Sequence, residues 1–147
     1  MFLGQYQLNL DENRRMALPA SFRELLAGGA YVTRGFEQNL VIMSDQVFQE
    51  ICKRIAGLNM ADPLARLLLR LILGNASRLD VNESGNVALP KELSQVIGLD
   101  KELVLVGEGD YCEVWAPSGW EQQTNTLMDM AANAERFAGL DLALYRA

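Results

Sequence analysis

The chain has 147 residues, half of them apolar, and a formal net charge of −6. This length and apolar content exclude wholesale disorder and predict one ordinary core or two closely packed half-domains. The acidic balance excludes a protein coated in positive potential, so nucleic-acid binding would require basic residues gathered on one surface. Candidates for such a surface occur early in the chain, at Arg14, Arg15, Arg23 and Arg34.

The first part of the chain predicts strands, a polar turn and a short helix. Apolar and polar residues alternate over 5–10, which is typical of a half-buried strand. A polar turn at 11–14 follows, and the alternation resumes over 16–18, so this segment predicts a hairpin. A short helix over 20–27 then ends at two glycines. Two further short strands are expected at residues 31–33 and 40–43.

Two helices are predicted in the middle of the chain. The first, over 45–56, has apolar residues along one face. The second spans 62–73, with Asp62 at its N-cap and Pro63 at its first helical position. Because this second helix is apolar nearly all round, it should be buried on more than one side. A central core helix and a helix at a subunit interface both fit that pattern.

The second part of the chain repeats the first after about 70 residues, a period longer than the usual solenoid unit. Residues 81–90 match residues 10–19, and a final helix over 118–137 matches the helix over 45–56. The repeat predicts an α+β fold with two halves, 1–75 and 76–147, related by pseudo-twofold symmetry. The second turn carries Asn82 and Asn86 where the first carries Asp11 and Arg15.

Nothing in the sequence indicates an enzyme. The chain has no histidine, the commonest general base and metal ligand. It also lacks a nucleophile elbow, a phosphate loop and a carboxylate-rich metal constellation. Cys52 and Cys112 match no metal spacing and are predicted to be reduced core residues. We therefore expect no enzymatic activity, no metal, no cofactor and no small-molecule substrate.

A cytoplasmic location is expected. The densest apolar stretch, 64–73, is shorter than the roughly 18 uncharged residues of a membrane helix and contains Arg66 and Arg70. Residues 1–6 lack the basic region and long apolar stretch of a secretory signal. Both features predict a protein without membrane contact.

Several segments, in their order and spacing, resemble the MraZ family over nearly the whole chain. They are Met1-Phe2-x-Gly4, Asp11-x-x-x-Arg15-x-x-x-Pro19, the Asp62-Pro63 helix running into Leu73-Gly74-Asn75-Ala76-Ser77, and Val104-Leu105-Val106-Gly107 followed by Glu113-Val114-Trp115. The resemblance implies two tandem SpoVT/AbrB-type halves that combine into a swapped-hairpin β-barrel with flanking helices. It also implies a nucleoid-associated transcriptional regulator of the bacterial division and cell-wall gene cluster, which assembles into rings and binds short direct repeats in promoter DNA.

The resemblance also assigns candidate DNA-binding residues. Asp11 and Arg15 match the ends of the family signature Asp-x-x-x-Arg, whereas Asn13 and Arg14 stand where a basic residue and a glycine are expected. In the second half both ends of the signature are replaced, although an amide can still contact adenine or phosphate. Arg23, on the short helix, is a phosphate contact or part of a solvated face. The candidates are Asp11, Asn13, Arg14, Arg15 and Arg23, with Asn82 and Asn86 in the second-half loop.

The chemistry of the first loop is compatible with this assignment. An Asp that opens a turn can accept hydrogen bonds from later backbone amides, and Asp11 can also pair with Arg15. A rigid Arg15 can bond two acceptors of guanine, while Arg14 neutralises a phosphate. The alternative is that Asp11 and Arg15 form only a solvated ion pair.

The expected partner is double-stranded promoter DNA, bound by a homo-oligomer that is expected to be a ring. Several weakly binding loops on one rim would gain affinity through effective concentration. The alternative function is an antitoxin-like or scaffold ring whose main partner is a protein, which the acidic balance and the altered second loop also fit.

Overall fold

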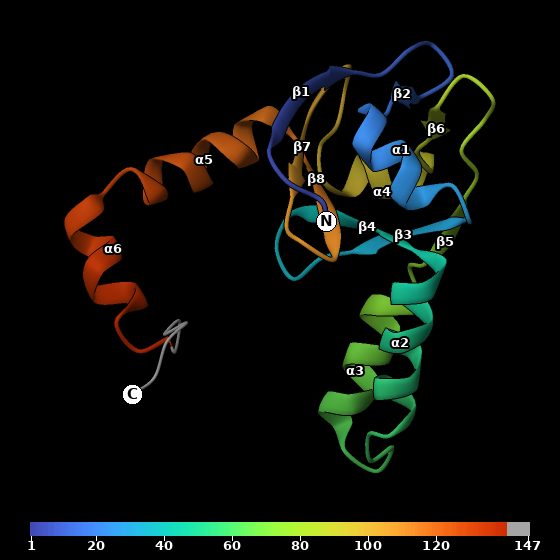
Figure 1. Cartoon of the computed structure of the whole chain (residues 1–147). Helices are drawn as coiled ribbons and strands as arrows, with labels where there is room; N and C mark the ends of the chain where they lie inside the picture. Colours follow the sequence, from blue (N-terminus) through green and yellow to red (C-terminus); the bar gives the residue numbers. More distant parts are fainter. Residues whose placement is uncertain (141–147) are drawn as a thin grey trace, which may run out of the picture.

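The structure is a computed structural model that describes residues 1–140, and it confirms an antiparallel α+β fold (Figure 1). The first part contains β1 (Gln5–Asn9), β2 (Arg15–Ala17), α1 (Ala20–Leu26), β3 (Ala30–Arg34), β4 (Asn39–Ser44), α2 (Asp45–Ala56) and α3 (Pro63–Ile72). The second contains β5 (Ser77–Leu79), β6 (Asn86–Ala88), α4 (Lys91–Val96), β7 (Glu102–Gly107), β8 (Tyr111–Trp115), α5 (Pro117–Leu127) and α6 (Met130–Phe137). The end of the predicted second half, 141–147, lies outside the described residues.

The two halves exchange strands within a six-stranded antiparallel sheet of order β1-β7-β8-β4-β3-β5. Strand β1 pairs with β7 of the second half, and β5 pairs with β3 of the first half. The two registers are equivalent, since Gln7 lies opposite Val104 and Arg78 lies opposite Tyr31. Each half therefore completes the sheet of the other.

A two-stranded ribbon, β2 paired antiparallel with β6, joins the halves a second time. At each end of the ribbon, a main-chain N–H of one half donates a hydrogen bond to a carbonyl of the other half. The Leu18 N–H donates to the Gly85 carbonyl at 3.1 Å, and the Leu89 N–H donates to the Arg14 carbonyl at 3.0 Å. These matching bonds are the local expression of the pseudo-twofold symmetry.

The turn predicted between the first two strands is present, but the predicted pairing of these strands with each other is wrong. The turn itself closes, because the Asp11 N–H donates to the Arg15 carbonyl at 2.9 Å. The strands then diverge, β1 to pair with β7 and β2 to pair with β6. The reason is burial: in the ribbon Met16 lies opposite Val87, and both side chains are buried in the shared core.

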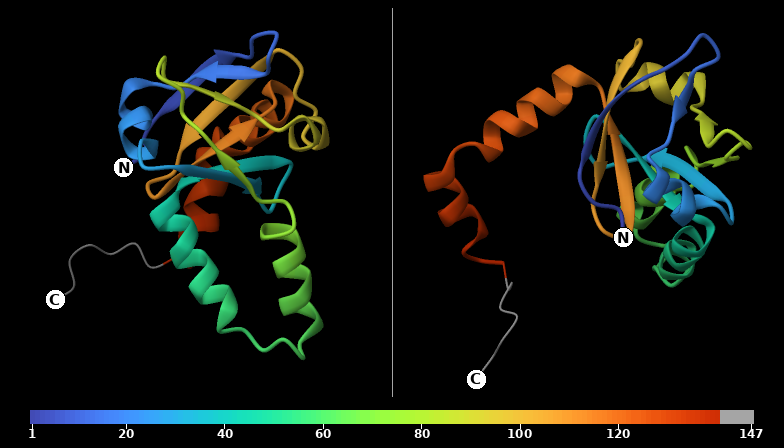
Figure 2. Two further views of the ribbon diagram at one scale, coloured as in Figure 1. Left: turned by 90° about the vertical axis from the view of Figure 1, so that its right-hand side faces the viewer. Right: turned by 45° about the horizontal axis from the view of Figure 1, so that its top comes forward.

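The family resemblance implies a swapped-hairpin β-barrel, but the strand pairing of residues 1–140 does not close one. Within residues 1–140 the six-stranded sheet ends at β1 and β5, and the ribbon forms a separate sheet. Each ribbon strand has three residues, and the two pair with each other, so no strand bridges the two edges. The observed architecture is an open, twisted sheet with the ribbon on one side (Figure 2).

The core lies between the inner face of the sheet, the ribbon and the short helices α1 and α4 (Figure 1). Its largest fully buried side chains come from both halves: Met16, Leu18, Phe22, Leu26, Leu40, Ile42, Leu103 and Leu105. The Phe22 ring makes edge-on contacts with the rings of Phe2 and Tyr6, at centroid distances of 4.9 and 5.3 Å. This shared core fixes the ribbon and therefore the turns that lead into it.

Helices α2 and α3 form an antiparallel pair that projects from the sheet (Figure 2). Helix α3 begins as predicted, since the Asp62 carboxylate accepts from the Leu64 N–H at 2.9 Å and a proline follows the cap. The prediction that α3 is buried on more than one side is wrong within a single chain. Leu64 and Leu67 are 72% and 57% exposed, and Ala65 is the one buried residue of this helix.

The helix predicted over 118–137 is two helices, α5 and α6. The Asp129 side chain caps α6 by accepting from a first-turn N–H at 3.1 Å, which starts a new helix rather than continuing α5. Trp120 of α5 packs on Trp115 with ring centroids 5.8 Å apart. Helix α6 has no buried residue and extends away from the sheet (Figure 1).

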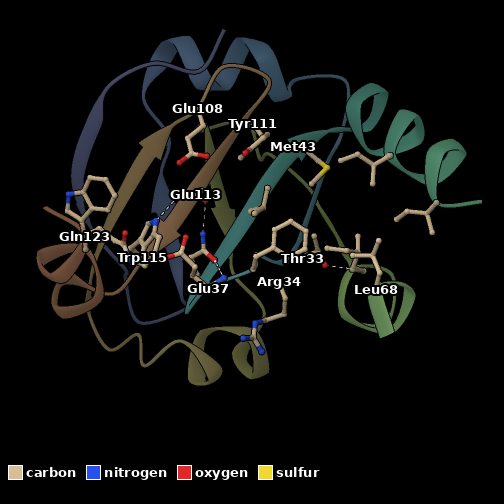
Figure 3. A pocket seen from close by; sticks show the side chains of 18 of the residues that line it. Thr33, Arg34, Glu37, Met43, Leu68, Glu108, Tyr111, Glu113, Trp115 and Gln123 are labelled. Atoms are coloured by element: carbon tan, nitrogen blue, oxygen red, sulfur yellow. Dashed lines mark hydrogen bonds between the residues drawn. The ribbon is translucent and has the colours of Figure 1, made fainter. Parts of the chain in front are cut away.

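An apolar groove of about 580 Å³ crosses the outer face of the sheet, between the α2–α3 pair and α5 (Figure 3). Met43 and Leu68 line one side, and Trp115 lines the other. The carboxylate of Glu113 lies in its floor, where it accepts from the Asn39 side-chain amide at 2.7 Å and the Trp115 indole N–H at 2.9 Å. Burial, reinforced by Glu108, raises the pKa of Glu113 to about 7.

The free energy of unfolding should therefore fall as the pH rises from 4.5 to about 7, the range set by the pKa of Glu113. Because the folded-state pKa of Glu113 lies above its ordinary value of 4.5, the native state keeps a proton that the unfolded chain releases. This contribution is complete below pH 4.5 and is lost as the pH rises through about 7. Urea denaturation of Glu113→Gln should show a flatter pH dependence than the parent chain, whereas the exposed control Glu121→Gln should not. Equal slopes in all three proteins would contradict this assignment.

Candidate nucleic-acid interface

The first loop is held in shape by the side chain of Asp11. Its Oδ1 accepts from the Asn13 N–H at 2.8 Å and from the Arg15 N–H at 2.9 Å. This confirms the predicted turn-forming role of the carboxylate. The ion pair that the sequence allowed between the Asp11 and Arg15 side chains is not present within the described residues. The carboxylate is engaged by the backbone instead, and the exposed Arg15 guanidinium is left without that partner.

The second loop has the same geometry built from an amide. Asn82 Oδ1 accepts from the Ser84 N–H at 3.0 Å and from the Asn86 N–H at 2.8 Å. An oxygen acceptor is all that this turn requires, so asparagine replaces aspartate without changing the backbone. The two loops therefore differ in charge but not in conformation.

One position in each loop has a positive φ angle. Gly85 has φ +79°, and its repeat equivalent Arg14 has φ +60°. Glycine adopts this region freely, whereas a residue with a Cβ adopts it at a cost. Arg14 is half-buried, and its Nε atom is buried without a hydrogen-bond partner in the part of the chain that the structure describes.

Arg23 of α1 lies over the second loop rather than the first. Its Nε donates to the Leu18 carbonyl at 3.3 Å, and its side chain occupies the space that a Cβ on Gly85 would need. The absence of a side chain at Gly85 thus lets the exposed Arg23 cross from one half to the loop of the other. Sequence reasoning placed Arg23 near the first loop and missed this exchange.

The ribbon brings residues from both loops to one surface. A shallow depression of about 340 Å³ is lined by Arg15 of the first half together with Asn82, Asn86 and Arg78 of the second. Arg15 reaches this place because it pairs with Ala88 in the β2–β6 register. Asn13 lies in a neighbouring depression with Asp11 and Lys101. We refer to residues 11–15, 82–86, Arg23 and Arg78 together as the loop surface.

The charges of the loop surface nearly cancel in a single copy. Its four arginines, Arg14, Arg15, Arg23 and Arg78, are accompanied by three acidic residues, Asp11, Glu12 and Glu83, and Asp80 lies beside Arg78. Electrostatic attraction to a polyanion would therefore be modest for one copy. Arg78 was missed from the sequence, because its relation to the loop surface depends on the pairing of β5 with β3.

Two residues singled out from the sequence lie elsewhere. Arg34 is half-buried and lines the groove on the outer face of the sheet, at the other end of β3 from the loop surface (Figure 3). Phe48 stacks on Tyr31 at a centroid distance of 4.1 Å and is a packing residue. Among residues 1–140 no cluster of side chains is arranged to hold a metal, and no helix is long and apolar enough to span a membrane.

Comparisons with known proteins identify relatives along the whole chain. A family model described as "MraZ protein, putative antitoxin-like" matches twice, over residues 1–71 and 72–141. A protein of Herpetosiphon aurantiacus named "Transcriptional regulator MraZ" is 37% identical over 89% of this chain and 92% of its own length. One of the same name from Leifsonia xyli is 39% identical over 82% of this chain and 85% of its own length. The solution structure of PHS018 from Pyrococcus horikoshii matches 78% of this chain and 88% of that chain, but its TM-score of 0.32 and identity of 16% are too low to bear on the fold.

The two loops predict opposite effects of substitution at the positive-φ position. Arg14→Gly should raise the free energy of unfolding by up to about 1 kcal/mol, because it relieves the left-handed strain at some cost in chain entropy. Gly85→Ala should lower it by about 1 kcal/mol or more, because a Cβ there adds strain and collides with Arg23. Urea titrations measure both, and Gly85→Ala combined with Arg23→Ala should recover the part due to the collision. Destabilisation by Arg14→Gly as large as that by Gly85→Ala would refute this account.

Proposed function

The chain belongs to the MraZ family of transcriptional regulators, and we propose that it binds duplex DNA through the loop surface. The observation that carries the proposal is the exposure of Arg15 at the end of a turn whose backbone is fixed by Asp11. Its backbone N–H is fixed by Asp11, it lies beside Asn86 of the other half, and no ion pair with Asp11 neutralises it. As a member of a family of transcriptional regulators, the protein is not expected to be an enzyme.

We assign roles by chemistry and position. Arg15 and Asn86 are the proposed base-reading groups, since guanidinium and amide side chains pair with guanine and adenine in the major groove. Arg14 and Arg23 are proposed to bind phosphates, which position a protein on the duplex. Asp11 and Asn82 shape the turns, and Asn13 is proposed as a further contact from the tip of the first loop.

The exchanged strands support treating the two halves, 1–75 and 76–147, as parts of one DNA-binding unit with a swapped-hairpin origin. We further propose that the DNA consists of short direct repeats in the promoter of the division and cell-wall gene cluster, and that the protein acts in the cytoplasm on the nucleoid. These targets are what the family resemblance implies, and the name of the relatives supports the regulator role alone.

A homo-oligomer, proposed to be a ring, fits two further features. The exposed Leu64 and Leu67 give α3 an apolar face that one chain leaves uncovered. The near cancellation of charge on the loop surface makes one copy a weak binder. Several copies on one rim would bind repeated DNA boxes with avidity and without additional contacts per copy.

A protein partner is the second candidate function. It is favoured by the acidic balance of the chain and by the antitoxin-like description of the family model. The two functions differ in their response to salt, because phosphate contacts release counterions and produce a steep loss of DNA affinity with increasing salt concentration. A gel shift on DNA upstream of the chain's own gene, repeated across salt concentrations, separates them.

Arg15→Ala should remove the preference for repeat DNA over scrambled DNA of the same composition. A bidentate contact to guanine is worth about 1–3 kcal/mol of discrimination, so the preference should fall roughly tenfold or more. The matched control is Arg54→Ala, an exposed arginine on α2 far along the chain from both loops. Full preference retained by Arg15→Ala in a fluorescence anisotropy titration would exclude Arg15 as the reader.

Leu64→Glu combined with Leu67→Glu should disrupt assembly without unfolding the chain, because both side chains are exposed in one copy. We expect a smaller species in light scattering, weaker binding to multi-repeat DNA, and unchanged affinity for a single repeat. An unchanged oligomer, or an equal loss on single and multiple repeats, would remove α3 and avidity from the proposal.

A further inference from the structure

We propose that Arg78 binds a DNA phosphate and supplies the positive charge that the second-half loop lacks at Asn86. This inference rests on the proposed DNA-binding function and extends it to a residue of β5 that lies outside both loops.

Arg78 and Gln7 occupy equivalent places in the two halves. Gln7 of β1 pairs with Val104 of β7, and Arg78 of β5 pairs with Tyr31 of β3, in matching registers of the exchanged strands. In the same repeat, Asn86 corresponds to Arg15. The first half therefore has an amide, Gln7, on its edge strand and a guanidinium, Arg15, at the end of its loop. The second half has the guanidinium on its edge strand and the amide at the end of its loop. Each half keeps one positive charge across this pair of positions.

The fold brings the relocated charge to the loop that lost its own. Arg78, Asn82 and Asn86 line the same depression, together with Arg15 from the other half. A duplex laid on Arg15 and Asn86 would therefore have Arg78 at the border of its footprint. Residues at such borders typically contact the backbone, which fixes orientation, rather than base edges.

The guanidinium of Arg78 lies over the aromatic ring of Tyr31. Its guanidinium carbon lies 5.8 Å from the ring centroid of Tyr31, which is itself stacked on Phe48 at 4.1 Å. Gly29, with φ +117°, leaves room for the group, since a Cβ there would come within 2.9 Å of Nη2. A guanidinium can lie against an aromatic ring and still donate to phosphate with its edge, which a flexible ammonium does less well.

The charge of Arg78 is only weakly compensated. Its Nε lies 3.5 Å from Asp80 Oδ1, and the two side chains are 55% and 87% exposed. Exposed pairs of this kind contribute little and yield to a stronger anion. The contact engages Nε, and more than half of the Arg78 side chain stays exposed to an incoming phosphate.

Salt titration of DNA affinity tests the proposal with the full, assembled chain. The probes are a duplex carrying the repeats upstream of the chain's own gene and a scrambled duplex. Arg78→Gln, which copies Gln7, should weaken binding to both duplexes by a similar factor. It should also reduce the slope of log affinity against log salt by about one per engaged copy. Arg78→Lys should keep most of the slope, and the exposed control Arg54→Gln on α2 should change neither quantity.

A rescue experiment ties the effect to charge rather than to packing on Tyr31. Adding Asn86→Arg to Arg78→Gln places a guanidinium in the second loop at the position equivalent to Arg15 of the first loop. This second substitution should restore the slope of log affinity against log salt. An unchanged slope in Arg78→Gln, with normal parent binding, would overturn this inference alone and leave the proposed function intact. A parent chain that binds neither duplex, even at low salt, would overturn both. The rescue could also fail while thermal unfolding shows that the Arg78→Gln chain is destabilised. That result would assign Arg78 a structural role and would also overturn the inference.

Discussion

The antiparallel pairing of β2 with β6 is the interaction on which the rest of the structure depends. It is short, but it places Met16 and Val87 opposite each other in one core built by both halves. Because β2 and β6 each directly follow one of the loops, their pairing brings the two loops to the same surface. A local hairpin in each half would have buried the same residues separately and kept the loops apart. Long-range pairing of this kind is favoured here because one larger core removes more apolar surface from water.

Symmetry of the backbone coexists with asymmetry of the side chains. Both loops use one side-chain oxygen, from Asp11 or Asn82, to accept two backbone N–H groups. The turn therefore tolerates exchange of a carboxylate for an amide, and it tolerates Arg14 where its equivalent is Gly85. Backbone geometry is thus maintained while the charge is redistributed, which is how a duplicated unit can specialise its two surfaces.

The surfaces that one chain leaves uncovered lie opposite the core. The outer groove, the apolar face of α3 and the extended α6 all expose apolar groups that a single copy does not bury. Exposed apolar surface of this extent is a usual mark of association in proteins. The groove differs from the others because it also buries Glu113, whose raised pKa makes this face sensitive to pH near neutrality.

The sequence by itself determined the local elements, because these depend on residues close together in the chain. The cap at Asp62, the two turns, the short helices after each proline and the duplication were all legible from spacing and residue type. The turn role of Asp11 was likewise predictable, since an Asx turn is a local motif. The break before α6 also has a local cause, the cap at Asp129, which the helix expected over 118–137 did not include.

Only the tertiary structure decided which strands pair, and several sequence expectations failed for that reason. Alternation of apolar residues says that a strand is half-buried, not which partner it takes, so the local pairing of the first two strands was wrong. The same limit hid Arg78, which no loop motif includes and which meets the loop surface through the pairing of β5 with β3. Burial of α3 was mispredicted because an apolar helix can be covered by its own chain or by another, and periodicity does not distinguish the two.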